Sequence, residues 1–470
     1  MSAKPSSMSP GLIVLVLALL LGLQPITTDL YLPALPALTD GFGASMSQAQ
    51  LTLTSLLLAF GLSQLVWGPL SDRFGRRPIL LLGTALFVVA SIGSTFSPSM
   101  EQLIVWRIVQ GIAMGAGVMC ARAIVRDLYA PTEGARMMSK GLTGLGVIAC
   151  GSAPLGGLLS QQFGWRVALM ALAVFGAITL ALLVWRFEET LPQKNPRALE
   201  PATLLRTWGR IARHPTFWAF ALLATTTYGG LFTFLAASSF VFIKVLGLSK
   251  TVYGLLMFTM SLSYIVGTLA CRRLLPRFGV RRTVAIAGFF TLAGGTLMGV
   301  LGLLGAQSLW AIILPFYLFM LGHGVHQPCG QSGAVSPFPQ AAGAASALSG
   351  FLMMVAAFFM GGWLGKSLAA TGDGAGTVLP LTNGVWFWSV LVAATAWTLV
   401  QRHGEGAPLR HFAASPPRGT TPVARQSRFH GVCWKLANSS PIRLNPLVPT
   451  HERTTIAGQL PRHRRPNGQW

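Results

Sequence analysis

The chain has few acidic residues and little charge of any kind for its length. Of its 470 residues, 12 are Asp or Glu, and 10% of the chain is charged, whereas a soluble domain carries roughly 25% charged residues. So few carboxylates disfavour a water-soluble globular protein of this size. Cysteine is also scarce: the chain has five, without C-x-x-C spacing, which argues against a disulfide framework and against a zinc site. Disorder of the whole chain is excluded, because 52% of the residues are hydrophobic.

What the sequence does contain is a series of long runs without Lys, Arg, Asp or Glu, the longest at 283–365. A helix that crosses a bilayer needs roughly 20 mostly apolar residues, and a backbone in lipid must satisfy its own hydrogen bonds, which favours helices. We therefore predict an all-α polytopic membrane protein. About twelve spans are expected, near residues 11–33, 49–70, 78–97, 102–125, 138–161, 165–186, 216–243, 251–273, 283–305, 309–332, 343–366 and 384–402.

The net charge of +23 is unevenly distributed. If the N-terminus is cytoplasmic, most Lys and Arg between the spans fall in cytoplasmic connections, as the positive-inside rule requires. An even number of spans then places both termini in the cytoplasm. Residues 403–470 are rich in Arg and Pro, which predicts a disordered basic tail, and nucleic acid is not an expected partner. A cleaved signal peptide at 1–35 is the alternative interpretation of the first apolar run.

A short motif occurs twice. The sequence LSDRFGRR at 70–77 has a counterpart, LLPRFGVR, at 274–281. Each copy lies between the second and third spans of a group of six, which predicts two similar halves, a common plan in transporters. The expected boundaries are 1–187 and 216–402 for the halves, with a polar, proline-rich cytoplasmic linker at 188–215.

The segment GPLSDRFGRR at 68–77 resembles the cytoplasmic loop signature of the major facilitator superfamily. Residues 28–36 (TDLYLPALP) resemble the first-helix signature of its bicyclomycin and chloramphenicol resistance (Bcr/CflA) branch of drug:proton antiporters. Residues 107–111 (RIVQG) resemble the fourth-helix arginine motif of proton-coupled members. Residues 153–157 (APLGG) resemble the fifth-helix antiporter motif, with Ala153 in place of a glycine and one residue missing before the paired glycines.

The resemblance implies a major facilitator fold and a multi-pass protein of the bacterial cytoplasmic membrane that exports drug-like molecules in exchange for protons. The first motif is then a conformational latch in which a carboxylate at a helix end pairs with nearby arginines. Its expected members are Gly68, Asp72, Arg73, Gly75, Arg76 and Arg77; the antiporter motif contributes Pro154, Gly156 and Gly157. A metabolite exporter or importer of the same fold is the alternative function, and a non-transport membrane protein a more distant one.

Asp29 is the acidic residue that lies well inside an apolar span, and an ionisable residue in a membrane is a functional candidate. Counting along the helices places Asp29 and Arg107 at a similar depth in the outer half of the bilayer. We expect Asp29 to be the proton site and Arg107 its electrostatic partner. The alternatives are an interfacial position for Asp29 and backbone hydrogen bonding for Arg107.

Several polar and aromatic side chains are candidates for a substrate cavity, although each of them is also compatible with helix packing. They are Gln110, Met114, Tyr228, Phe232, Tyr264, Tyr317 and His323. Arg122, near the cytoplasmic end of the fourth span, is expected to extend to the membrane interface. His323 and His326 have no acidic residue near them in sequence, so no metal is expected.

No cofactor is expected either. The segments GGWLGKS at 361–367 and GLG at 144–146 lack glycines that nucleotide motifs require, and neither follows a predicted strand. The chain is therefore not expected to be an enzyme or to use ATP, and its energy source should be an ion gradient. We expect it to act as a monomer.

Overall fold

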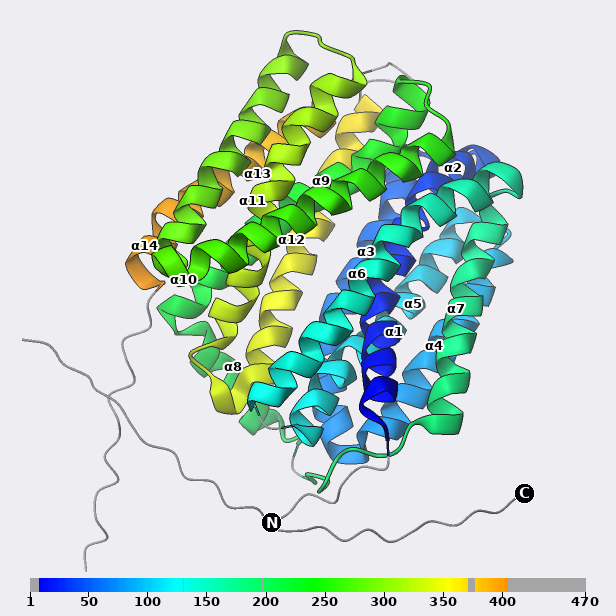
Figure 1. Cartoon of the computed structure of the whole chain (residues 1–470). Coiled ribbons are helices and arrows are strands. Elements are labelled where there is room, and N and C mark those ends of the chain that lie inside the picture. The colour runs from blue at the N-terminus through cyan, green and yellow to red at the C-terminus, as the bar shows by residue number, and fades with distance from the viewer. Residues whose placement is uncertain (1–7, 130, 197, 371–376, 405–470) are drawn as a thin grey trace, which may run out of the picture. The chain divides into compact units, whose positions relative to one another are not determined.

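The computed structural model describes residues 8–129, 131–196, 198–370 and 377–404, and every regular element in these ranges is a helix (Figure 1). Eleven stretches are long and apolar enough to cross a membrane. One of them, α10 (Lys250–Leu303), has 54 residues and a break in its middle, so it provides two crossings. The predicted all-α fold with twelve spans is confirmed. The predicted tail lies almost wholly outside the described residues.

The first six crossings follow the predicted spans within a few residues, although the second and fourth helices extend further at their C-terminal ends and the fifth extends further at its N-terminal end. Their helices are α1 (Pro10–Asp29), α3 (Met46–Phe74), α4 (Arg76–Thr95), α5 (Met100–Leu128), α6 (Pro131–Gln162) and α7 (Trp165–Arg186). One difference follows α1. The prolines at 33 and 36 do not leave an irregular loop; each lies in the first turn of a short helix, η1 (Leu32–Ala34) and α2 (Leu35–Phe42), where a missing N–H costs nothing.

The other six crossings are built from α9 (Pro215–Phe240), which continues as η2 (Val241–Val245), and from α10 to α14. The bounds are α11 (Leu309–Val335), η3 (Pro339–Ala341), α12 (Ala342–Ala370), α13 (Leu379–Trp397) and α14 (Leu399–His403). The uncharged run at 283–365 is interrupted at 304–308 and 336–338, close to the connectors expected from its polar and proline residues. Within the predicted linker, residues 201–212 form an additional short helix, α8 (Pro201–Ala212), that the sequence analysis did not predict.

Glycine breaks both copies of the repeated motif at the same place. Gly75, between α3 and α4, has φ 112°, and Gly279, inside α10, has φ 69°. Both values are in the region that residues with a Cβ rarely adopt. The corresponding glycines therefore turn the chain between the second and third crossings of each group of six.

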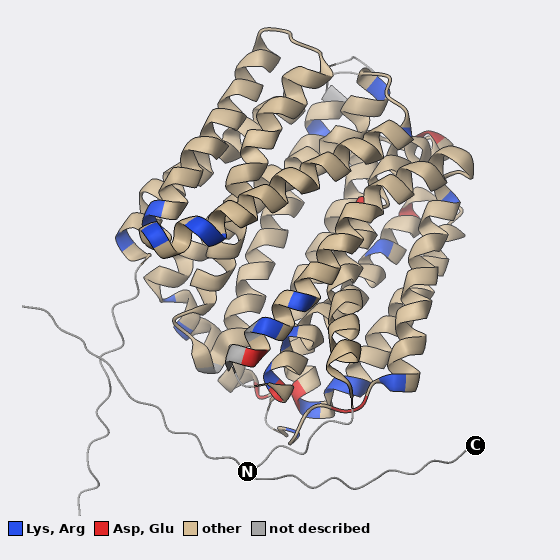
Figure 2. Cartoon of the chain, viewed as in Figure 1, with Lys and Arg blue, Asp and Glu red and all other residues tan. Residues whose placement is uncertain are grey.

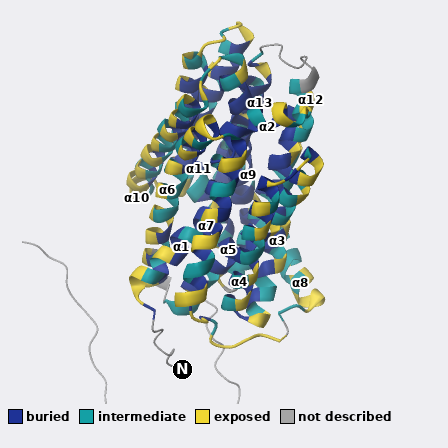
Figure 3. Cartoon of the chain, turned by 90° about the vertical axis from the view of Figure 1, so that its right-hand side faces the viewer, coloured by how far each residue is buried: buried dark blue, intermediate teal, exposed yellow. Residues whose placement is uncertain are grey.

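The outward faces of the helices are apolar. Among their exposed side chains are Leu82, Val105, Trp185, Phe289 and Trp310, and Figure 3 shows exposed residues along the outer faces of the helices. Figure 2 shows long stretches of helix without Lys, Arg, Asp or Glu, with charged residues gathered mostly near helix ends. Such a surface suits contact with lipid rather than water.

Candidate functional site

A cavity of about 270 Å³ lies between helices of the first six crossings and helices of the second six. From the first group α1, α3 and α6 contribute to its walls, and from the second α9, α10 and α11. The walls are largely apolar and aromatic, with a few polar groups, as is usual for small-molecule sites. They include Gln24, Asp29, Met257, Met260, Phe316, Met320 and Gln327.

Asp29 lies at the last residue of α1, and its carboxylate faces this cavity. The hydroxyl of Thr28 donates a hydrogen bond to its Oδ1 at 2.9 Å. Among the described residues that line the cavity, Asp29 is the one with a formal charge. Asp29 therefore lines an internal cavity at the C-terminal end of α1, and its role as the proton site stays a prediction.

Arg107 is fully buried on α5, outside the cavity wall. Its Nη1 donates to Gln110 Oε1 at 2.7 Å, and its Nη2 donates to the carbonyl oxygen of Thr27 at 3.2 Å. The guanidinium carbon lies 4.2 Å from the centre of the Tyr31 ring, close enough for a cation–π interaction. Arg107 therefore fixes the C-terminal end of α1 to α5 through neutral groups.

The expected pair between Asp29 and Arg107 is not formed in this structure. Thr27 and Tyr31 are four residues apart and face α5, whereas Asp29 is two residues from each. Two residues correspond to a turn of about 200° around a helix, so the carboxylate is on the opposite flank of α1. The two side chains share a depth, as counting along the helices predicted, but Arg107 does not contact the carboxylate.

Four of the seven candidate cavity residues line the cavity: Tyr228, Phe232, Tyr264 and His323. The other three do not. Gln110 lies between Arg107 and α4, where its Nε2 donates to Ser91 Oγ at 2.7 Å, and Met114 is packed in the core of the first six crossings. The hydroxyl of Tyr317 is 2.7 Å from that of Thr259, within a contact between α10 and α11.

The two histidines of α11 have separate environments. His323 lies in the cavity wall, with its Nδ1 2.9 Å from the Thr227 hydroxyl, whereas His326 Nε2 is 3.2 Å from the carbonyl oxygen of Val284. No group of three or more potential metal ligands occurs among the described residues. The groups around His323 and His326 are hydroxyl, carbonyl and aromatic groups.

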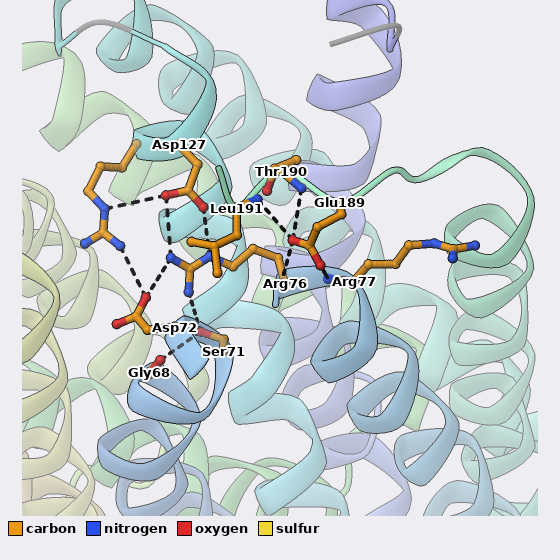
Figure 4. Close-up of polar contacts among 10 residues, drawn as sticks. Gly68, Ser71, Asp72, Arg76, Arg77, Asp127, Glu189, Thr190 and Leu191 are labelled. Atoms are coloured by element: carbon orange, nitrogen blue, oxygen red, sulfur yellow. Dashed lines mark hydrogen bonds and ion pairs between the residues drawn. The ribbon is translucent and has the colours of Figure 1, made fainter. Parts of the chain in front are cut away.

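The latch motif forms a cluster of ions at the junction of α3, α4 and α5 (Figure 4). Arg76, with a side chain 1% exposed, donates to Asp72 Oδ1 at 2.7 Å, to Asp127 Oδ2 at 2.8 Å and to the Ser71 hydroxyl at 2.6 Å. Asp127 is itself 7% exposed. The exposed Arg73 takes no part in this cluster, since its guanidinium lies over the ring of its neighbour Phe74.

A third carboxylate lies in this region, and like Asp127 it was not predicted from the sequence. Glu189, just after α7, accepts hydrogen bonds from the backbone N–H groups of Arg76 at 2.8 Å and Arg77 at 3.1 Å, as Figure 4 shows. The first residue before α4 is Gly75, which has no side chain to cap the helix. Glu189 therefore supplies the cap, and its charge also suits the positive end of the helix dipole.

The antiporter-like motif brings three helices into backbone contact. A Cβ atom at Gly156 would collide with the carbonyl oxygen of Leu30, one residue after Asp29, and a Cβ at Gly157 would collide with that of Lys250 on α10. Gly254 on α10 in turn approaches the backbone of Pro154. Small residues on both sides thus allow α6 to pack closely against α1 and α10.

We expect Gly156→Ala to destabilise the protein by about 1–3 kcal/mol, because the added methyl group overpacks this junction. Gly151→Ala, on the same helix, is the matched control, since no atom lies within 4 Å of its added Cβ. That substitution should be neutral, or stabilising by up to about 1 kcal/mol through helix propensity. Thermal unfolding of the two purified variants in detergent measures the difference, and equal stabilities would contradict the packing argument.

The sequence of the chain is similar to those of known membrane transporters. Residues 17–361 match the family model of the Major Facilitator Superfamily. Multidrug resistance protein D of Escherichia coli is 30% identical over 366 residues, which cover 77% of this chain and 90% of that protein. A chloramphenicol resistance protein of Pseudomonas aeruginosa is 30% identical over 322 residues, covering 68% and 75% respectively.

Among solved structures, that of a D-xylose–proton symporter superposes with a TM-score of 0.66 at 17% identity, and the match covers 83% of this chain and 97% of the symporter. At this identity the likeness concerns the fold alone. The family model, in contrast, matches most of the chain. The protein is a membrane transporter that belongs to the Major Facilitator Superfamily.

Proposed function

We propose that the chain is a proton-coupled exporter of drug-like molecules that works by alternating access. The observation that carries the proposal is the position of Asp29: its carboxylate lies in the wall of the cavity between the two groups of six helices. The apolar surroundings favour the neutral acid, and an ionised carboxylate there attracts a proton or a basic substrate. The carboxyl group of Asp29 can therefore bind a proton and a basic substrate in alternation.

The direction of coupling follows from this competition. A proton that enters from the outer side neutralises Asp29, which weakens its attraction for a basic substrate and releases the substrate outward. The names of the relatives, a multidrug resistance protein and a chloramphenicol resistance protein, support drug export. With both termini in the cytoplasm of a bacterium, the protein would reside in the inner membrane as a monomer, and Arg107 would hold α1 in place while Asp29 titrates.

Polar contacts between the two groups of helices support alternating access. At the end expected to be outside, Gln50 Nε2 donates to the Ala236 carbonyl oxygen at 2.8 Å, and Lys250 donates to Gln161 Oε1 at 3.1 Å and to the Ser160 carbonyl oxygen at 3.2 Å. These bonds join α3 to α9 and α6 to α10. Opening toward the outside would require these hydrogen bonds to break. The ion cluster around Arg76, at the opposite end, would change in strength between the inward-open and outward-open states.

A susceptibility screen tests the proposal. We expect cells that lack other pumps to gain resistance to some cationic or neutral drugs when they express the protein, and to lose that resistance when a protonophore collapses the gradient. A panel of drugs and metabolites separates drug export from the alternative, a metabolite exporter or importer. Resistance or flux that persists without a proton gradient would contradict proton coupling.

A further inference from the structure

A second, smaller cavity of about 100 Å³ adjoins the cavity that holds Asp29. The two share Gln24, Tyr228 and Gln327 as wall residues. We call the larger one, lined by Asp29, the acidic lobe, and the smaller one, lined by Arg122, the basic lobe. Arg122 is the residue with a formal charge among the described residues of the smaller cavity, so the two lobes carry opposite charges.

Arg122 was expected at the membrane interface, but its side chain turns inward instead. Its Nη1 donates a hydrogen bond to the hydroxyl of Ser346 on α12, across the space between the two groups of helices. No carboxylate pairs with Arg122 within the part of the chain that the structure describes. A guanidinium placed inside an apolar bundle without a counter-ion is costly, which makes it a candidate for binding a ligand.

The groups around Arg122 also have unused hydrogen-bonding capacity. The hydroxyl of Ser349, 3% exposed, and the side-chain carbonyl oxygen of Gln327 have no hydrogen-bond partner, and both residues line the basic lobe, as does Gln331. Buried polar atoms are normally paired, so unpaired ones in a cavity wall call for a partner that the protein does not supply. The Ser349 hydroxyl can donate a hydrogen bond, and together with the planar guanidinium it suits a carboxylate, which guanidinium binds through two parallel bonds. The Gln327 oxygen is an acceptor and suits a donor group of the same molecule.

We propose that the basic lobe is a carboxylate subsite, and that the substrates of this transporter include elongated zwitterions whose amine lies in the acidic lobe while the carboxylate lies against Arg122. This inference rests on the proposed export function and specifies its substrate class. Gln24, which lines both lobes, lies five residues before Asp29 on α1, or roughly 7.5 Å along the helix. A rigid molecule with its charges at opposite ends can therefore have one charge in each lobe.

Ciprofloxacin and its methyl ester form a suitable pair of probes. The acid has a piperazinium and a carboxylate at opposite ends of an aromatic body, and the ester keeps the amine but loses the negative charge. We expect the purified wild-type protein to bind the acid at least about tenfold more tightly than the ester, as a charged hydrogen-bonded pair provides. Equilibrium dialysis of both probes gives the ratio of the two Kd values.

In Arg122→Gln the ratio should fall to about one, with the affinity for the ester changed less than about threefold, because only the charged pair is lost. Arg136→Gln, which removes an exposed arginine of α6 outside both lobes, is the matched control and should keep the wild-type ratio. If Arg122→Gln cannot be purified, Arg122→Lys retains the charge but not the planar pair of donors, and an intermediate ratio is expected.

Three results would overturn the subsite: a wild-type protein that binds the acid no better than the ester, an unchanged ratio in both Arg122 variants, or an equal loss of both probes in them. The outcome is distinguishable from failure of the proposed function. Proton-dependent export of the ester without preference for the acid refutes the subsite alone. A preference for the acid in a protein that moves neither probe in response to a proton gradient refutes the export function alone.

Discussion

Asp29→Asn is expected to reduce proton-coupled export by at least about a hundredfold, while the protein still inserts into the membrane in normal amounts. The amide has nearly the same shape as the carboxyl group, so it preserves the packing at the end of α1 and the contact with Thr28, but it neither titrates nor attracts a cation. The loss corresponds to about 2.8 kcal/mol at about 1.4 kcal/mol for each factor of ten.

Drug-driven proton movement in proteoliposomes measures this effect. Asp29→Glu keeps a titratable carboxyl group and should retain part of the activity. Asp40→Asn makes the same chemical change at an exposed residue, where only a surface pair with Lys244 is lost, and such pairs contribute little. Proton movement in Asp29→Asn equal to that of the wild type would refute the role of Asp29, and equal losses in Asp29→Asn and Asp40→Asn would show that the effect is not specific to the cavity.

Arg76→Ala is the second substitution with a large expected effect. It removes the 2.8 Å partner of Asp127, whose side chain is 7% exposed, and leaves the exposed Arg126, at 3.9 Å, as the remaining ion-pair partner. Removal of one member of a buried ion pair typically costs about 3–5 kcal/mol. We therefore expect a clear drop in the unfolding temperature of the purified protein and loss of most transport activity, because the latch helices can no longer hold their relative positions.

Arg73→Ala provides the control, since it alters an arginine three residues away in the same motif that is exposed and makes no contact with the carboxylates of the cluster. Its unfolding temperature and activity should stay near those of the wild type. Restoration of stability by combining Arg76→Ala with Asp127→Asn would identify the uncompensated charge as the cause. Similar effects of Arg76→Ala and Arg73→Ala would mean that the motif acts through its total positive charge instead.

Apolar runs and the charges between them were enough to predict the helices that cross the membrane. Even the uncharged stretch 283–365 is interrupted near clusters of polar, glycine and proline residues, which favour turns, whereas the single prolines Pro315 and Pro328 lie inside α11. The short helices after α1 were not predicted, because a proline can either end a helix or occupy the first turn of a new one, as Pro33 and Pro36 do. The 54-residue α10 was correctly divided because its glycine repeats that of the first motif copy.

The site was harder to predict because it depends on which helix each face meets. Arg107, Gln110 and Met114 are separated by three, four and seven residues, which puts them on one face of α5, but that face packs against neighbouring helices, including α1 and α4, rather than the cavity. Asp127 and Glu189 were overlooked because each stands beside another charged residue in sequence and resembles an ordinary loop residue. Their partners are 51 and 113 positions away, a relation that one sequence does not reveal.

If Asp29 is the proton site proposed above, the contacts of Arg107 with the C-terminal end of α1 limit how protonation can act. The guanidinium holds the Thr27 carbonyl and the Tyr31 ring from the flank that faces away from the cavity, so neutralising the carboxylate breaks no bond to it. A helix is stiff. Any tilt or rotation of α1 that protonation of Asp29 produces must therefore also move the opposite side of α1, which Arg107 contacts. The first step of coupling between protonation and transport would then be a movement of α1 against its contact with Arg107.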